Sequence, residues 1–276
     1  MSGILDMKWQ PVQPARLLAA CADGSLHVLM VQPDDKAIHV TRQQAVKASD
    51  TMALSLDIND LGRQVISSSS DGSLSVLQAS ESAMSVTAQW HGHDLEAWNV
   101  AFDRWQDKVV YSGADDCMLK GWDLRQPGSA PTFVNRKSHT AGVCCIASSP
   151  RQEHCLLTGS YDEHIRMWDS RKLEAPLAEV STGGGVWRLK WHPSDPVQVL
   201  AACMHNGFVV VQADASTGNI RVVEEYPHQK SLGYGADWCS LPTGPFSIAA
   251  TCSFYDRLLH LWSPQTLCSD LTQSSS

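Results

Sequence analysis

The stretch Leu156–Arg171 reads Leu-Leu-Thr-Gly-Ser-Tyr-Asp-Glu-His-Ile-Arg-Met-Trp-Asp-Ser-Arg. It holds a short apolar run that ends in small residues, a turn centred on Asp162, and a second run with apolar residues at Ile165 and Met167. Alternating apolar positions beside a turn are typical of two antiparallel strands. We therefore predict a strand, a tight turn and a second strand over this stretch.

The same unit recurs along the chain. Val109–Arg125 repeats it as Val-Val-Tyr-Ser-Gly-Ala-Asp-Asp-Cys-Met-Leu-Lys-Gly-Trp-Asp-Leu-Arg. Both stretches carry Trp-Asp at the end of the second strand, which is the signature of a WD repeat. The turn residue returns at intervals of 44 to 50 residues, at Asp23, Asp71, Asp116, Asp162, Asn206 and Asp256. Because a WD40 blade spans roughly 40–45 residues and most helical repeats are shorter, this period favours a propeller.

We predict an all-β fold of the WD40 β-propeller class with six recognisable blades. One domain is expected over residues 1–268, followed by a disordered Ser-rich tail at 269–276. The sixth unit has no fourth strand after Trp262, and the chain begins directly on a first strand at Ile4. Propellers normally let one terminus complete the blade of the other. Two alternatives stay open: six blades close imperfectly, or an N-terminal blade is absent from this polypeptide.

The composition narrows the class of partner. The 276 residues are 43% hydrophobic and 18% charged, and their formal net charge is −8. Nucleic-acid binding needs clustered Lys and Arg, so we expect no nucleic-acid partner. No apolar run approaches the roughly 18 residues of a membrane span, and residues 1–9 lack the features of a signal peptide. We expect a cytoplasmic monomer with no membrane contact, whose partner is a protein or a small molecule.

The nine cysteines form no Cys-x-x-Cys pair, and their number is odd. Most of them fall inside predicted strands, where a reduced thiol serves as a small hydrophobic side chain. We therefore expect no disulfide framework, no metal site and no cofactor.

Many polar residues that resemble a catalytic triad have a structural explanation. In a WD blade, a His before the first strand, a Ser or Thr on the second, the turn Asp and the Trp of the third strand form a buried hydrogen-bonded set. Burial makes an unpaired member costly, so such sets belong to the scaffold. Two sets fit this pattern: His93, Ser112, Asp116 and Trp122, and His139, Thr158 or Ser160, Asp162 and Trp168.

Functional groups on propellers gather on the loops that enter first strands and on the turns between second and third strands. The candidates at these positions are Glu96, Trp98, Glu163, His164, Trp187, Arg188, His205, Tyr234 and Tyr255. Aromatic residues beside ionisable ones suit either a protein-binding hot spot or a small active site. No Gly-x-Ser-x-Gly elbow, P-loop, His-Glu-x-x-His or dinucleotide-binding motif accompanies them.

Longer phrases are more specific than the repeat itself. They are Ile4–Trp9, Glu96–Trp98, Val109–Asp116, Gly159–His164, Gly184–Pro193, Leu200–His205, Tyr234–Trp238 and Ala250–Asp256. With them the chain resembles the diphthine methyl ester hydrolases, WD-repeat proteins of diphthamide biosynthesis, from Ile4 to Trp262. The resemblance implies a carboxylic ester hydrolase that demethylates the diphthine methyl ester on the modified histidine of elongation factor 2. It also implies a seventh blade, which in relatives precedes Ile4.

Ester hydrolysis needs an activated water or nucleophile and a donor for the developing oxyanion. We assign His164 or His205 as general base, Glu163 as the group that orients it, and Arg188 as the oxyanion donor. Trp98 and Trp187 are expected to hold the modified imidazole, whose trimethylammonium group suits an aromatic cage. Tyr234 and Tyr255 complete the substrate-binding set. Cys144 is a further candidate nucleophile, although a buried strand cysteine is the simpler interpretation.

A non-catalytic scaffold is the competing class. The elements Trp122–Arg125 and Trp168–Arg171 both match Trp-Asp-x-Arg, which resembles the docking motif of cullin-4 ubiquitin-ligase substrate receptors. Such an adaptor would bind proteins through its rim and leave the ester unchanged.

Overall fold

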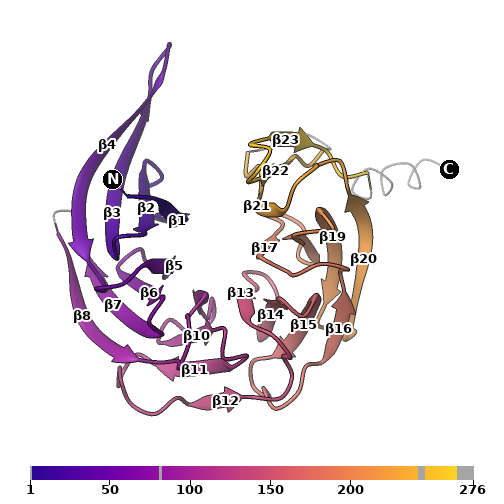
Figure 1. The fold of residues 1–276 in the computed structure, drawn as a ribbon, viewed down its shortest axis with the longest axis horizontal. Helices are drawn as coiled ribbons and strands as arrows, with labels where there is room; N and C mark the ends of the chain where they lie inside the picture. Colours follow the sequence, from indigo (N-terminus) through magenta and orange to yellow (C-terminus); the bar gives the residue numbers. More distant parts are fainter. Residues whose placement is uncertain (1, 81–82, 242–245, 266–276) are drawn as a thin grey trace. The chain divides into compact units, whose positions relative to one another are not determined.

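The computed structural model describes residues 2–80, 83–241 and 246–265. The predicted Ser-rich tail at 269–276 lies outside these residues. The chain divides into two compact units, an N-terminal unit of Met1–Lys137 and a C-terminal unit of Ser138–Ser276. Each holds three blades, so the all-β fold with six blades is confirmed (Figure 1). The described residues include no helix long and apolar enough to cross a membrane.

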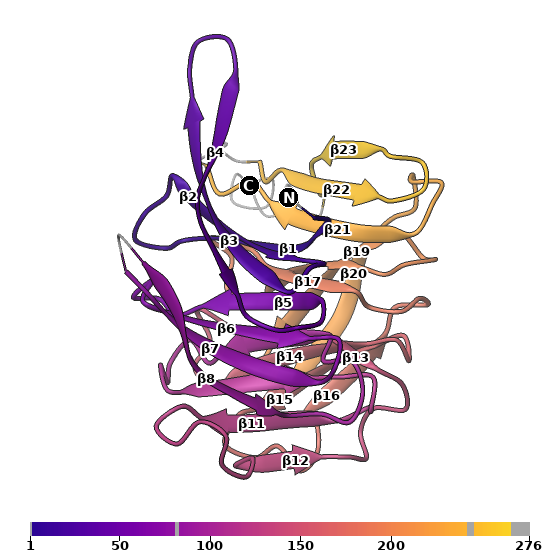
Figure 2. The ribbon, with the colours of Figure 1, turned by 60° about the vertical axis from the view of Figure 1, so that its left-hand side comes forward.

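The N-terminal unit consists of three antiparallel sheets of four strands each. Blade one contains β1 (Ile4–Trp9), β2 (Arg16–Cys21), β3 (Ser25–Pro33) and β4 (Ile38–Lys47); blade two contains β5 (Ala53–Ile58), β6 (Gln64–Ser69), β7 (Ser73–Ala79) and β8 (Met84–His91); blade three contains β9 (Asn99–Phe102), β10 (Val109–Gly113), β11 (Leu119–Asp123) and β12 (Phe133–Asn135). The β3–β4 hairpin extends beyond the other strands of this unit (Figure 2).

The C-terminal unit has two four-stranded sheets and, among the described residues, a sixth sheet of three strands. Blade four contains β13 (Val143–Ser148), β14 (Cys155–Ser160), β15 (His164–Asp169) and β16 (Ala178–Ser181); blade five contains β17 (Arg188–Trp191), β18 (Gln198–Ala202), β19 (Phe208–Asp214) and β20 (Asn219–Tyr226); blade six contains β21 (Gly233–Trp238), β22 (Ala249–Ser253) and β23 (Leu259–Trp262). The predicted absence of a fourth strand after Trp262 concerns residues that lie largely outside the described ones.

Within each unit, the core lies between the faces of successive sheets. Inner strands such as β6 and β18 are buried almost throughout, because both of their faces pack against a neighbouring sheet of the same unit. Outer strands such as β4 are exposed along most of their length. This arrangement leaves the loops and turns at the blade edges as the surface on which functional side chains can gather.

The six hairpin turns share one backbone conformation. The residue after the turn Asp or Asn has a positive φ in every blade, from Arg257 at 56° to Gly72 at 80°. Three blades place glycine there, which adopts this conformation without steric cost. The others place Cys117, Glu163 and Arg257 in the same left-handed region.

The predicted hydrogen-bonded set is complete in blade three. Trp122 Nε1 donates to Ser112 Oγ at 2.8 Å, and Ser112 Oγ lies 2.7 Å from His93 Nε2. His93 Nδ1 lies 2.9 Å from Asp116 Oδ2. The group has the order of a Ser-His-Asp triad, but Ser112 is fully buried and already accepts a hydrogen bond. The scaffold interpretation therefore holds for this blade.

Blade four departs from the prediction at its turn aspartate. Trp168 Nε1 donates to Thr158 Oγ1 at 2.9 Å, and Thr158 Oγ1 lies 2.9 Å from His139 Nε2, as expected. Asp162, however, pairs with Arg166 at 2.9 Å. Within the described residues, His139 Nδ1 is buried without a hydrogen-bond partner. The inclusion of Asp162 in the histidine set is thus corrected, because a buried guanidinium attracts the carboxylate more strongly than a neutral imidazole does.

Candidate functional site

Four aromatic side chains gather on loops and strand ends of blades five and six. The Trp187 and Tyr234 rings meet edge to face, with their centroids 5.4 Å apart. Tyr234 meets Phe254 at 6.4 Å, and Phe254 meets Tyr255 at 5.2 Å, again nearly perpendicular. We call these four residues the aromatic cluster. Edge-to-face packing of this kind is a favoured geometry for aromatic pairs.

The aromatic cluster borders a cavity of about 460 Å³. Its lining residues are Tyr234, Cys252, Ser253, Phe254, Tyr255 and Arg257. Phe254 and Tyr255 are 69% and 70% exposed, so their ring faces are accessible to a ligand. Burial raises the pKa of Tyr234, and the neighbouring Tyr255 and Tyr161 phenols add to the shift. Tyr234 is therefore a neutral phenol near pH 7, which can face a cation or donate a hydrogen bond.

Hydrogen bonds connect the turns that carry the predicted ionisable residues. Thr182 donates to the Glu163 carbonyl oxygen through both its backbone nitrogen at 2.9 Å and its hydroxyl at 3.1 Å. Asn206 Nδ2 donates to the Thr182 carbonyl oxygen at 2.6 Å. The backbone of Met204 bonds that of Gly233 in both directions, at 3.2 and 2.9 Å. The turns of blades four and five and the first strand of blade six are thus held in fixed positions.

The His164 ring is held by a hydrogen bond to the backbone. Its Nδ1 atom lies 2.7 Å from the Asp162 carbonyl oxygen, to which it must donate. The proton is therefore on Nδ1, and the lone pair of Nε2 is free to accept a proton from water. The half-buried ring starts β15. This contact orients the ring through the Asp162 carbonyl, and the roles assigned to His164 and to the Glu163 carboxylate stay predictions.

The other predicted ionisable residues, His205 and Arg188, belong to the same unit. His205 is exposed on the turn between β18 and β19, next to Met204. Arg188 begins β17 directly after Trp187, and its charge acts on the buried Cys145 thiol. Cys144 is buried, and its thiol donates to the Gly142 carbonyl oxygen at 3.4 Å. That burial favours the structural interpretation of Cys144 over the nucleophile.

Trp98 belongs to the N-terminal unit, where its Nε1 atom donates to Asp115 Oδ1 at 3.2 Å. Glu96 lies on the same loop and accepts a backbone hydrogen bond from Asp115 at 2.9 Å. Trp187 belongs to the C-terminal unit. The predicted pairing of the two indoles across one substrate therefore stays a prediction.

Two aromatic residues of this region escaped the sequence prediction. Phe254 is a member of the aromatic cluster, and Tyr161 lies near both Tyr234 and the backbone at Gly185. A signal for Tyr161 was present, because it directly precedes a turn aspartate, as the predicted Tyr255 does. Phe254 had no such signal, since its contacts depend on how blade six packs.

Comparison with known proteins defines the class first. The family WD domain, G-beta repeat matches residues 132–169. A chain in the crystal structure of the mitotic checkpoint complex overlays on 94% of this chain and 73% of its own length, with a TM-score of 0.76 and 20% identity. The blades, their turns and the complete set in blade three therefore belong to a WD40-repeat β-propeller protein.

Closer relatives define the family. Diphthine methyltransferase of Mus musculus is 43% identical over 86% of this chain and 53% of its own length. The diphthine methyltransferase homolog of Dictyostelium discoideum is 36% identical over 95% of this chain and 77% of its own length. The chain belongs to the diphthine methyltransferase family. It spans about half the length of the mouse relative.

Proposed function

We propose that the protein is a diphthine methyl ester hydrolase of the cytoplasm, acting on the modified histidine of elongation factor 2. Water attacks the ester carbonyl carbon, methanol leaves, and the carboxylate of diphthine remains. Diphthine appears in the names of the relatives, which supports this substrate. The products need no further reactant, because water supplies both the hydroxyl group and the proton.

The observation that carries the proposal is the aromatic cluster beside an accessible cavity. Diphthine bears a trimethylammonium group, which cannot donate hydrogen bonds and binds best against aromatic faces. Trp187, Tyr234 and Tyr255 offer such faces within one connected group. The Arg257 guanidinium in the cavity lining offers a partner for the carboxylate that hydrolysis releases. Together they suit the trimethylammonium group of the substrate and the carboxylate of the product.

His164 is the residue best placed to activate water. The Asp162 carbonyl holds its Nδ1 proton, so Nε2 can take a proton from the attacking water and return it to the leaving methoxide. His205 is the second candidate for this role. Arg188, beside Trp187 at the start of β17, is the proposed donor to the oxyanion.

The test is mass spectrometry of elongation factor 2 that carries the diphthine methyl ester, after incubation with the purified chain. Loss of one methyl ester is expected. His164→Ala with His205→Ala should lower kcat by about 10²–10⁴-fold. Trp187→Ala should raise KM about tenfold through the lost cation–π contact. A folded wild-type chain that leaves the ester intact would overturn the function, and a double variant with full activity would overturn the choice of base.

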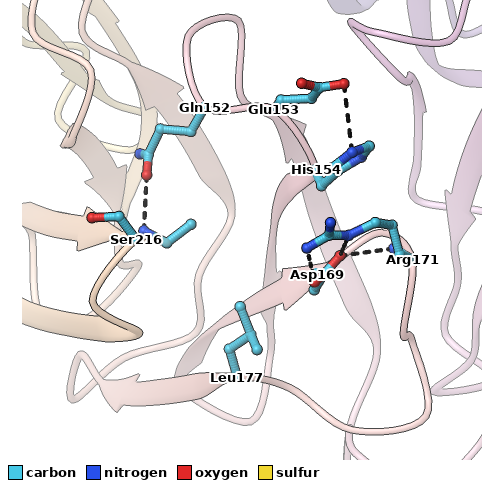
Figure 3. Close-up of a pocket in the computed structure, with 8 residues that line it drawn as sticks. Gln152, Glu153, His154, Asp169, Arg171, Leu177 and Ser216 are labelled. Carbon is cyan, nitrogen blue, oxygen red and sulfur yellow. Dashed lines mark hydrogen bonds and ion pairs between the residues drawn. The ribbon is translucent and has the colours of Figure 1, made fainter.

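A second candidate function rests on the two Trp-Asp-x-Arg elements. The Arg125 guanidinium contacts Asp123 with Nε at 2.9 Å, and that of Arg171 contacts Asp169 with Nε at 2.8 Å. Both arginines are exposed, at 73% and 64% of the side chain. Arg171 also lines a cavity of about 300 Å³ with Gln152, His154 and Leu177 (Figure 3). Each element thus presents an exposed arginine whose guanidinium is held in one orientation by its aspartate. The presence of this arrangement in two blades favours docking of a protein partner.

This docking function predicts that the chain co-purifies with the cullin-4 adaptor. Arg125→Glu and Arg171→Glu should each weaken that association and leave ester hydrolysis unchanged. Arg221→Glu is a matched control, since this arginine is bound to Gln212 on the surface of blade five. Association that survives both charge reversals would rule out these elements as the docking site.

A further inference from the structure

Three side chains with the chemistry of metal ligands meet at the hairpin turn of blade one. Cys21 ends β2, Asp23 lies on the turn, and His27 is the third residue of β3. One ligand atom from each, the thiol sulfur, a carboxylate oxygen and a ring nitrogen, lies within 4.8 Å of the other two. The strand register explains the meeting. Ala19 faces His27 across the hairpin, so Cys21, two residues from Ala19, lies on the same side of the sheet as His27.

His27 is buried and incompletely satisfied. His27 is only 3% exposed, and its Nδ1 atom has no hydrogen-bond partner among the described residues. Its Nε2 atom lies 3.1 Å from Ser25 Oγ, which in turn contacts the Asp23 carboxylate. A buried polar atom without a partner requires an explanation. A metal ligand accounts for it, because a ligating histidine commonly uses its second nitrogen for a hydrogen bond of this kind.

The turn is rigid and open to solvent on one side. Gly24 has a φ of 77°, and a Cβ atom there would lie 2.2 Å from the carbonyl oxygens of Ser49 and Thr51. Lys47 Nζ donates to the Asp23 carbonyl oxygen at 2.6 Å. Asp23 itself is exposed, which leaves a path for an ion to enter. A fixed backbone with ligands already close together lowers the entropy lost on binding.

We propose that Cys21, Asp23 and His27 form a binding site for a zinc-class divalent metal ion, with water at the fourth position. Thiolate and imidazole select such ions over Mg²⁺ and Ca²⁺, which require oxygen ligands. Tetrahedral zinc coordination places the three ligand atoms about 3.2–3.8 Å apart. The side chains must therefore move about 1 Å closer together when the ion binds. A search for paired cysteines misses this set, because it contains a single cysteine. This proposal departs from the sequence-based expectation of no metal site.

The test is a titration of the purified chain with Co²⁺, which replaces zinc and reports thiolate ligation by a charge-transfer band in the near ultraviolet. One equivalent should saturate the band, and Zn²⁺ should then displace Co²⁺ and raise the midpoint temperature of unfolding. Cys21→Ser and His27→Gln should each abolish the band. Asp23→Asn, a change at an exposed residue that leaves the core intact, should weaken Co²⁺ binding at least tenfold.

Two variants serve as matched controls. Cys252→Ser removes an exposed thiol of the C-terminal unit. His39→Ala removes an exposed histidine that pairs with Asp34 at 2.6 Å in the same blade. Both should keep the band unchanged. A wild-type chain without the band, or a band that persists in Cys21→Ser, would overturn the proposal. The result is independent of ester hydrolysis.

Discussion

In blade three the turn aspartate is bonded to a histidine, whereas in blade four the equivalent aspartate is paired with an arginine. His93 satisfies Asp116, and Lys120, four residues after that aspartate, lies farther away at 3.9 Å. In blade four the residue at the same offset is Arg166, which contacts Asp162 at 2.9 Å. The same repeat motif thus allows two pairings of the turn aspartate, one with a histidine and one with an arginine. The residue four positions after the aspartate determines which pairing forms.

The pairing of Asp162 with Arg166 leaves the histidine of blade four, His139, without a carboxylate partner in the part of the chain that the structure describes. Burial and the charge of Arg166 lower the pKa of His139 to about 4, and its Nδ1 atom lacks a partner among the described residues. In blade three, burial also lowers the pKa of His93, but the Asp116 carboxylate opposes the shift. The arginine therefore leaves blade four with a less well satisfied histidine. In return it fixes the turn that carries Glu163 and His164.

The largest effect is expected on removing the cation of blade four. Arg166→Met leaves the buried Asp162 without its charged partner and should lower the free energy of unfolding by about 3 kcal/mol. Lys120→Met in blade three should cost only about 1 kcal/mol, because His93 still satisfies Asp116. Urea denaturation of both variants measures the contrast. Equal losses would show that the two blades use the same electrostatic arrangement.

Much of this contrast was beyond sequence reasoning. The strands, the turns and the histidine set of blade three follow from local alternation and fixed offsets, which is why they were predicted. Arg166 gave no signal, because its choice of Asp162 depends on burial and side-chain reach. In the aromatic cluster, too, the positions of some residues could be predicted but their contacts could not. Trp187 and Tyr234 lie at the predictable starts of first strands, but their contact joins two blades.

Replacing the two histidines should lower the free energy of unfolding more in blade three than in blade four, the reverse of the order expected for Arg166 and Lys120. His93→Leu leaves both Asp116 and Ser112 short of a partner and should destabilise the protein by about 2–3 kcal/mol. His139→Leu loses one bond to Thr158 but also removes a buried unsatisfied nitrogen, so about 1 kcal/mol is expected. Thermal unfolding followed by circular dichroism checks both. A larger loss for His139→Leu would mean that its Nδ1 atom has a partner in solution.

The pH dependence sharpens the same comparison. Because the pKa of His139 is lowered to about 4 in the folded state, the unfolded chain binds a proton first as the pH falls. This contribution to stability is therefore present above about pH 6.5 and is lost between pH 6.5 and 4, by about 2 kcal/mol between pH 7.5 and 5. His139→Leu should remove that part of the loss. Urea denaturation at the two pH values tests it, and an unchanged pH dependence in the variant would contradict the burial of a neutral ring.

The smallest effect concerns the two turns themselves. Cys117 in blade three and Glu163 in blade four both adopt a left-handed backbone, with φ of 62° and 69°. Glycine relieves this strain but adds freedom to the unfolded chain, so Cys117→Gly and Glu163→Gly should each raise the free energy of unfolding by about 0.5 kcal/mol. If the Glu163 carboxylate acts on the ester, only Glu163→Gly will also lower kcat. Gains in stability with unchanged kcat in both variants would mean that the carboxylate is dispensable, and that the strained turn serves to hold His164 against the Asp162 carbonyl.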